Sequence, residues 1–159
     1  MEWNKENTAA VGRIPSGLFI VTAGTDRELD GYLASWIQQV SFAPLMVSVA
    51  IKPGRPCHDA IIKSGHFAIN IIGKKGASVL KHFWKGYDPH SNPFANLEYE
   101  WASHGGVLLK QAMCALECQV KEVLTPGDHQ IILADVLRCH MLDASDENMV
   151  HVRKSGLDY

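Results

Sequence analysis

Short runs of apolar and β-branched residues, separated by turns containing glycine or proline, recur through the first half of the chain. Residues 18–23 (LFIVTA) form the first run, and the polar stretch after it ends in Asp30-Gly31, a turn signal that leads into residues 32–37. A further run, residues 45–51 (LMVSVAI), stops at a Lys-Pro-Gly breaker. Runs of this length and composition predict strands, the first two paired as a hairpin.

Two segments have the pattern of short helices outside a sheet. Residues 56–64 begin with a proline, which suits a first helical turn, and are followed by Gly65, a typical C-terminal stop. Residues 77–85 place four large apolar side chains on one stripe. Residues 67–72 (FAINII) predict a strand between these helices, and residues 1–12 predict an N-terminal tail or short helix.

The second half of the chain predicts a long loop followed by long strands. Residues 86–106 are rich in Pro, Asn, Gly and His, and a loop of this length is expected to cover a functional site. Residues 113–124 and 129–140 alternate apolar and polar positions and predict two strands, and residues 149–152 predict a short last one. Because extended segments dominate, we expect a mainly β protein whose antiparallel sheet closes as a small barrel.

Composition narrows the class of protein. The chain has 159 residues, so we expect residues 1–159 to be a single domain. Fifteen Lys and Arg against 17 Asp and Glu leave a net charge of −2, which provides no electrostatic surface for nucleic acid or for an anionic membrane. No signal peptide or membrane-length apolar run is present, so we expect a cytoplasmic protein. The four cysteines and eight histidines lack metal-ligand spacing, so we expect no metal site.

The turn from Lys52 to Arg55 is a candidate anion site. It joins a predicted strand to a predicted helix start, so backbone N–H groups, the positive end of the helix dipole and two cations converge there. This arrangement suits a phosphate. The same residues could equally form a connection whose basic side chains only face water.

Residues 33–41 (LASWIQQVS) are a second candidate, because Ser, Trp and two Gln interrupt an apolar strand. Hydroxyl and amide groups beside a large aromatic ring suit a flat heteroaromatic ligand. An exposed strand end with a half-buried Trp would have the same pattern.

His129 follows a tight Gly-Asp turn and is a third candidate, either as a catalytic residue or as a solvated capping residue. Walker A, G-x-G-x-x-G and G-x-S-x-G motifs are absent from the sequence. NTPase, Rossmann and α/β-hydrolase functions are therefore excluded.

In this order the segments resemble the flavin reductase-like family, the FMN-binding split-barrel proteins. The resemblance runs from Arg13 to Val152. It rests on residues 15–22 (PSGLFIVT), the Ala34-Ser35 and Val40-Ser41 pairs, residues 52–58, residues 67–71 (FAINI) and residues 127–129 (GDH). It implies a six-stranded antiparallel Greek-key split β-barrel with peripheral helices. It also implies a homodimer that holds FMN near the subunit interface.

The resemblance also implies the site residues. The implied cofactor-binding residues are Leu33, Ala34, Ser35, Trp36, Gln39, Val40 and Ser41 for the flavin ring, and Lys52, Arg55, Cys57 and His58 for the phosphate. His129 resembles the family histidine near the flavin and nicotinamide, and is the candidate catalytic residue. Many members have Thr-Ala-Asn-Ser at the position of residues 33–36 (LASW), and the Trp resembles the flavoredoxin and flavodiiron-associated branch, which transfers electrons to a protein partner.

Family members commonly pass hydride from NADH or NADPH to flavin, so the resemblance implies a flavin oxidoreductase with FMN, or FAD, as cofactor. Hydride transfer from nicotinamide to flavin requires no protein nucleophile, because the cofactors carry the chemistry. A non-catalytic flavin- or haem-binding carrier or sensor would therefore show the same sequence features. A single domain implies that any electron-acceptor protein is a separate chain. The choice of nicotinamide, the acceptor, and whether flavin is cofactor or substrate stay open.

Overall fold

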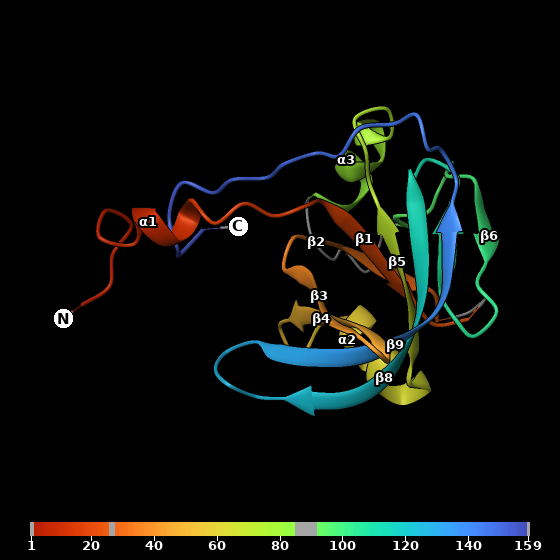
Figure 1. The fold of residues 1–159 in the computed structure, drawn as a ribbon, viewed down its shortest axis with the longest axis horizontal. Coiled ribbons are helices and arrows are strands. Elements are labelled where there is room, and N and C mark those ends of the chain that lie inside the picture. The colour runs from red at the N-terminus through yellow and green to blue at the C-terminus, as the bar shows by residue number, and fades with distance from the viewer. Residues whose placement is uncertain (1, 26–27, 85–91, 159) are drawn as a thin grey trace.

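The computed structural model describes residues 2–25, 28–84 and 92–158 (Figure 1). In chain order its elements are α1 (Ala9–Gly12), β1 (Phe19–Ala23), β2 (Asp30–Ala34), β3 (Ile37–Phe42), β4 (Leu45–Ile51), α2 (Pro56–Ser64), β5 (His66–Ile71), the 3-10 helix η1 (Ala77–Val79), α3 (Leu80–Phe83), β6 (Tyr99–Trp101), β7 (Val107–Leu109), β8 (Cys114–Leu124) and β9 (Gln130–Met141). No helix of this described part is long and apolar enough to cross a membrane.

The main sheet has seven strands in the order β2-β1-β5-β8-β9-β4-β3, and every neighbouring pair is antiparallel. The edge strands β2 and β3 are separated by only Ser35 and Trp36, so the chain passes directly from one edge to the other. The Ala50 N–H donates to the Trp36 carbonyl at 3.0 Å and fixes this passage beside β4. The predicted mainly β split barrel is confirmed.

The number of strands differs from the prediction. The sequence predicted one strand over residues 32–37, but the structure divides that region between β2 and β3, which gives seven strands rather than six. The physical reason is a change of partner. Residues up to Ala34 pair with β1, whereas Ile37 pairs with Val49 of β4.

The barrel interior is filled by the inward faces of the strands and closed at one end by α2. Along β4 the side chains of Val47, Val49 and Ile51 are buried and alternate with less buried neighbours, as period-2 patterning predicts. α2 packs on β1, β2 and β5 and buries Ile61 completely. Complete burial of one such side chain contributes roughly 1.5–3 kcal/mol. The predicted bounds of α2 are confirmed, including Gly65 in the left-handed conformation with φ 71°.

Three predicted elements are shorter than expected. The N-terminal helix covers only Ala9–Gly12, and the second predicted helix is η1 followed by α3, which ends at Phe83. Trp84 lies beyond that end and is 66% exposed, so it does not join the predicted apolar stripe. The predicted strand over residues 149–152 is absent from the described residues; the C-terminal segment makes only isolated bridges, because it runs past single residues of two different segments.

The predicted loop over residues 86–106 falls partly outside the described residues, which resume at residue 92. Its described part contains β6, which pairs with β7 in a second, two-stranded sheet against the barrel. Thr22 of β1 and Asn70 of β5 attach this sheet to the barrel, because both side chains form hydrogen bonds with the Val107 backbone. The described part of the loop therefore covers the outer face of β1 and β5.

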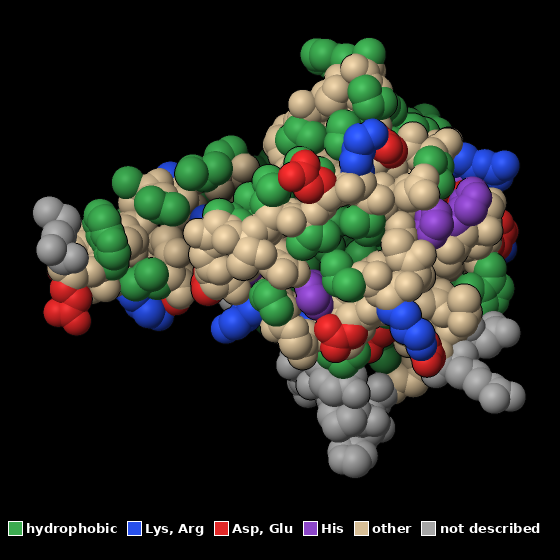
Figure 2. Space-filling view, turned by 90° about the horizontal axis from the view of Figure 1, so that it is seen from below, with side chains coloured by type: hydrophobic (Ala, Val, Ile, Leu, Met, Phe, Trp, Pro, Cys, Tyr) green, Lys and Arg blue, Asp and Glu red, His purple; other side chains and the backbone are tan. Residues whose placement is uncertain are grey.

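The helix α1 and residues 151–158 pack side by side and project from the barrel as an arm, called the terminal arm below (Figure 1). The Arg153 N–H donates to the Gly12 carbonyl at 3.0 Å, and the Gly156 N–H donates to the Thr8 carbonyl at 2.8 Å. A Cβ at Gly12 would lie only 2.7 Å from the Ser155 nitrogen, so the close approach requires glycine. Exposed apolar side chains lie on the arm (Figure 2), among them Val11, Val152 and Leu157, and Trp3 and Ile14 on either side of α1 are exposed as well.

Candidate functional site

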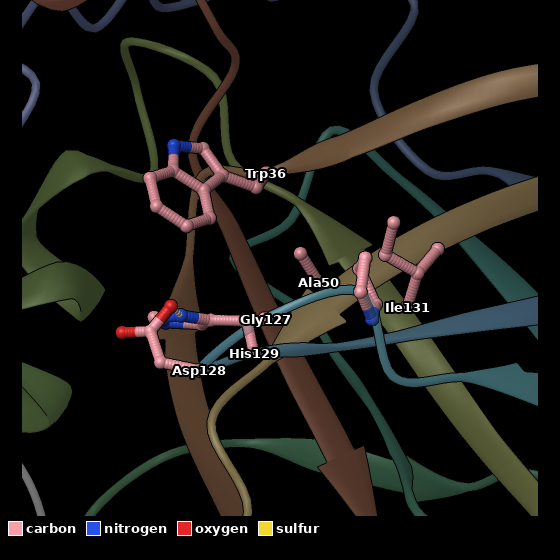
Figure 3. A pocket seen from close by; sticks show the side chains of 7 residues that line it. Trp36, Ala50, Gly127, Asp128, His129 and Ile131 are labelled. Carbon is pink, nitrogen blue, oxygen red and sulfur yellow. Dashed lines mark hydrogen bonds and ion pairs between the residues drawn. The ribbon is translucent and has the colours of Figure 1, made fainter.

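An open pocket of about 300 Å³ lies at the end of the barrel where β4 ends, β9 begins and the chain passes from β2 to β3 (Figure 3). Its lining residues are Trp36, Ala50, Pro126, Gly127, Asp128, His129 and Ile131. Small and apolar groups form its floor, and two rings and a carboxylate stand at its side (Figure 3). A pocket that is mostly apolar with a few convergent polar groups is the usual form of a small-molecule site.

Two of the predicted site residues meet in this pocket. The rings of Trp36 and His129 lie with their centroids 5.0 Å apart and their planes at 57°. His129 Nδ1 is 3.0 Å from Asp128 Oδ1, and this contact together with the charge of the imidazole lowers the pKa of Asp128, with a smaller contribution from the charge of Lys52. The structure therefore places a ring pair and a carboxylate side by side in this pocket.

The predicted phosphate turn lies beside this pocket. Gly54 has φ +82°, a left-handed conformation that favours glycine, and Arg55 is the N-cap of α2 with extended backbone. The guanidinium carbon of Arg55 lies 5.9 Å from the Tyr32 ring centroid, a cation–π contact that orients the side chain. Lys52 is exposed and acts on Asp128 at the pocket rim. Two cations and the start of a nine-residue helix thus converge at one end of the barrel.

Cys57 and His58 are at this helix start, but their side chains point inward. The Cys57 thiol is buried, lies 3.7 Å from the Val21 carbonyl oxygen, and burial raises its pKa well above the ordinary value. His58 Nε2 is 2.6 Å from Gln130 Oε1 and ties α2 to β9. Any contact with a phosphate from these two residues would come from backbone N–H groups of the first helical turn.

The residues predicted to bind the flavin ring lie in different parts of the structure. Ala34 is buried in the barrel core, whereas Leu33 packs against the second core cluster on the outer side. Ser35 lies next to Trp36 in the passage between the edge strands. Gln39, Val40 and Ser41 follow along β3, where Ser41 pairs with Met46, four residues from Ala50 of the pocket. At about 3.3 Å per residue this separation is roughly 13 Å.

The structure thus brings together Trp36 and His129 in the pocket, with Lys52 near Asp128 at its rim, and it leaves the far part of β3 outside the pocket. Arg55 lies three residues beyond Lys52, at the start of α2 and beside Tyr32. The structure also adds two residues that were not predicted. Asp128 could have been suspected from its position before His129. Arg153 had no sequence signal, because its place over the Trp36 ring depends on the course of the terminal arm.

The chain is thus an antiparallel split-barrel domain with a basic strand-to-helix turn and an aromatic pocket at the same end. Residues 11–156 match the model of the flavin reductase like domain, and the chain belongs to that family. The predicted resemblance is therefore confirmed.

Similar proteins fit this assignment. Diflavin flavoprotein A 1 of Synechocystis sp. is 34% identical over 151 residues, which are 94% of this chain and 26% of that protein. The chain thus spans about a quarter of the length of this curated relative.

Among solved structures, the NADH:FAD oxidoreductase SgcE6 of Streptomyces globisporus is 23% identical with a TM-score of 0.82, covering 91% of this chain and 86% of that one. It has also been solved in complex with NAD and FAD fragments. The styrene monooxygenase flavin reductase of Pseudomonas putida S12 is 23% identical with a TM-score of 0.78, covering 91% and 90% of the two chains. At these identities the likeness shows a shared fold.

Proposed function

We propose that the protein is a flavin oxidoreductase that binds FMN, or FAD in its place, and receives hydride from NADH or NADPH. The observation that carries the proposal is the position of two features at the same end of the barrel. One is the ring pair of Trp36 and His129 in the pocket, and the other is the basic turn of Lys52 and Arg55 at the start of α2. Membership of the flavin reductase like family supports flavin as the ligand.

The residues present fit such a cofactor. A phosphate needs cationic donors and free backbone N–H groups, and the turn from Lys52 to Arg55 offers both at the head of α2. A flat ring needs an apolar wall and a stacking surface, which Ala50, Ile131 and Trp36 provide. When bound, flavin would supply the hydride-accepting ring.

The protein's own residues would contribute binding, orientation and exclusion of water. Arg55 is held by its contact with Tyr32 and would fix the phosphate end. Trp36 would fix the plane of the ring, and His129 would border the nicotinamide. Asp128 contacts Nδ1 of His129 and so orients that imidazole at the pocket. Orientation of two bound partners in this way is a sufficient source of rate for hydride transfer.

A second function, a flavin-binding electron carrier without nicotinamide oxidation, is favoured by one observation. The relative from Synechocystis sp. is named a diflavin flavoprotein, and this chain corresponds to about a quarter of it. In that case a separate protein would donate and accept the electrons. A haem-binding carrier is distinguished from both by its visible spectrum.

We also propose that the protein is a homodimer. Apolar side chains stand exposed on the terminal arm and at the turn from β3 to β4, where Phe42 is 90% exposed. Surfaces of this kind usually mark contacts with another protein. Light scattering behind a sizing column gives the mass directly, and a monomer at micromolar concentration would count against the dimer.

Titration with FMN and FAD followed by anaerobic addition of NADH or NADPH tests the function. We expect tight uptake of one flavin and bleaching of its visible band by a nicotinamide. A protein that takes up neither flavin contradicts the proposal. Flavin uptake without bleaching by either nicotinamide supports the carrier function instead.

A further inference from the structure

Arg153 lies over the Trp36 ring although it is 117 residues away from Trp36 in the chain. Its guanidinium carbon is 5.0 Å from the centroid of the Trp36 ring, and that ring lines the pocket and contacts His129. The side chain is carried there by the terminal arm. A cation from the terminal arm therefore lies against a ring that lines the pocket.

Within the described residues, the hydrogen bonds of Arg153 bring no counterion to its charge. Nη1 donates to the Asp158 carbonyl at 3.1 Å and Nη2 donates to the Val11 carbonyl at 3.4 Å, so two of the five N–H donors are used, both by neutral acceptors. Among the described residues no carboxylate forms an ion pair with Arg153; Asp158 itself pairs with Lys5. The positive charge and the remaining donors are available to an anion.

The arm fixes this position more firmly than a mobile tail would. The backbone of Arg153 bonds to Gly12, and the close approach at Gly12 admits no larger residue. Ser155 is buried, and its hydroxyl donates to the Asp158 carboxylate at 2.8 Å. The guanidinium is thus preorganised, which reduces the entropy lost when it binds a ligand.

We propose that Arg153 binds a nucleotide phosphate at the mouth of the Trp36–His129 pocket. Planar guanidinium groups bind phosphate with two parallel hydrogen bonds and stack on aromatic rings, and Arg153 already stacks on Trp36. In the proposed function Lys52 and Arg55 hold the flavin phosphate, so the phosphate at Arg153 belongs to the nicotinamide nucleotide. The inference rests on the proposed function for this choice of ligand.

The test compares hydride donors with and without phosphate in Arg153→Gln. NADH and NADPH carry phosphates, whereas N-benzyl-1,4-dihydronicotinamide carries the same hydride donor and none. We expect the variant to raise KM for the phosphate-bearing donor about tenfold, the scale of one charge-assisted hydrogen bond, and to leave the rate with the benzyl donor unchanged. If the substitution only disturbs the terminal arm, the rates with both kinds of donor should fall equally. That result would overturn the inference.

Lys154→Gln is the matched control, because it removes the same charge from the next residue, which is exposed. It should leave KM unchanged. Arg153→Lys keeps the charge but loses the paired hydrogen bonds, and its KM should lie between those of the wild type and Arg153→Gln.

Two binding titrations distinguish a nicotinamide-nucleotide phosphate from the flavin phosphate. Neither titration depends on turnover. NAD⁺ and NADP⁺ binding by calorimetry should weaken about tenfold in Arg153→Gln. If Arg153→Gln binds FMN more weakly than the wild type but binds riboflavin equally well, Arg153 contacts the flavin phosphate instead. Equal binding of all four ligands by the wild type and the variant overturns the inference. If the wild type oxidises neither nicotinamide but binds NAD⁺ through Arg153, the proposed function fails and the inference stands.

Discussion

His140 Nε2 donates to Glu117 Oε1 at 2.9 Å between the neighbouring strands β8 and β9. Glu117 is only 2% exposed, and its second oxygen accepts the Ser103 N–H at 2.8 Å. His104 faces the same carboxylate at 3.6 Å. The carboxylate therefore attaches the segment between β6 and β7 to the outer face of the barrel.

This cluster predicts loss of stability in acid. Burial alone would raise the pKa of Glu117, but the hydrogen bonds from His140 and Ser103 and the charges of His140 and Arg138 outweigh it and lower the pKa below 4.5. A carboxyl whose pKa is lower in the folded state stabilises the fold above its unfolded pKa, and this stabilisation is lost as the pH falls through the folded pKa. We expect the free energy of unfolding to decrease from about pH 4.5 downward.

Glu117→Gln tests the origin of that decrease. The variant should lose about 1–3 kcal/mol at pH 7, because the charge-assisted bonds are lost, and its free energy of unfolding should depend less on pH below 4.5. Urea unfolding at several pH values measures both. Glu122→Gln, an exposed position on the same strand, is the control; if it has the same effect, the cluster around Glu117 is not the cause.

Arg55→Ala is predicted to weaken FMN binding by about 1.5–3 kcal/mol, the scale of a charge-assisted hydrogen bond to an anion. Riboflavin, which lacks the phosphate, should bind the variant and the wild type alike. Lys63→Ala at the other end of α2 removes a cation whose partner is the exposed Glu28, and it should change neither affinity. Unchanged FMN affinity in Arg55→Ala would remove this residue from the phosphate site.

Trp36→Ala is predicted to weaken flavin binding about fivefold, because a stacking surface worth about 1 kcal/mol is removed. Trp36→Phe keeps an aromatic face and should retain most of the affinity. Trp84→Phe provides the control, since Trp84 is 66% exposed outside the pocket. Flavin fluorescence titration measures the affinities of the three variants. Equal affinities in the wild type and Trp36→Ala would show that the flavin ring does not stack on Trp36.

The sequence predicted best where local chemistry and patterning agree. The helix α2 has proline at its start, glycine at its end and a buried Ile61, and its bounds are confirmed. The basic turn before it and His129 are brought to the same end of the barrel because β4 ends where β9 begins, with Ile51 paired to Gln130. That proximity follows from strand register, which the motif order only suggested.

The remaining features depend on long-range contacts that have no local signal. The split between β2 and β3 arises because the chain exchanges β1 for β4 as its partner at Ser35 and Trp36. The position of Arg153 arises from pairing of the two ends of the described chain, which neither end encodes alone. The inward direction of Cys57 depends on which face of α2 the barrel receives.

Asn70 within the FAINI segment is predicted to be a structural residue of the barrel rather than a ligand contact. It is fully buried; Nδ2 donates to the Ile20 and Val107 carbonyls at 3.1 and 3.0 Å, and Oδ1 accepts the Leu109 N–H at 2.7 Å. Alanine would leave the buried Leu109 N–H without its partner, whereas the Val107 carbonyl would keep the Thr22 hydroxyl. A buried group without a partner costs about 1–3 kcal/mol.

We therefore expect Asn70→Ala to lower the free energy of unfolding by about 1–3 kcal/mol, and to loosen β7 at Leu109. Hydrogen exchange at the Leu109 amide reports that loosening directly. Ser48→Ala removes a hydroxyl whose bond to Gln38 is long, at 3.4 Å, and should cost little. If folded Asn70→Ala protein keeps its stability but loses flavin affinity, Asn70 would instead belong to the binding site, and its bonds to β7 would not be its main role.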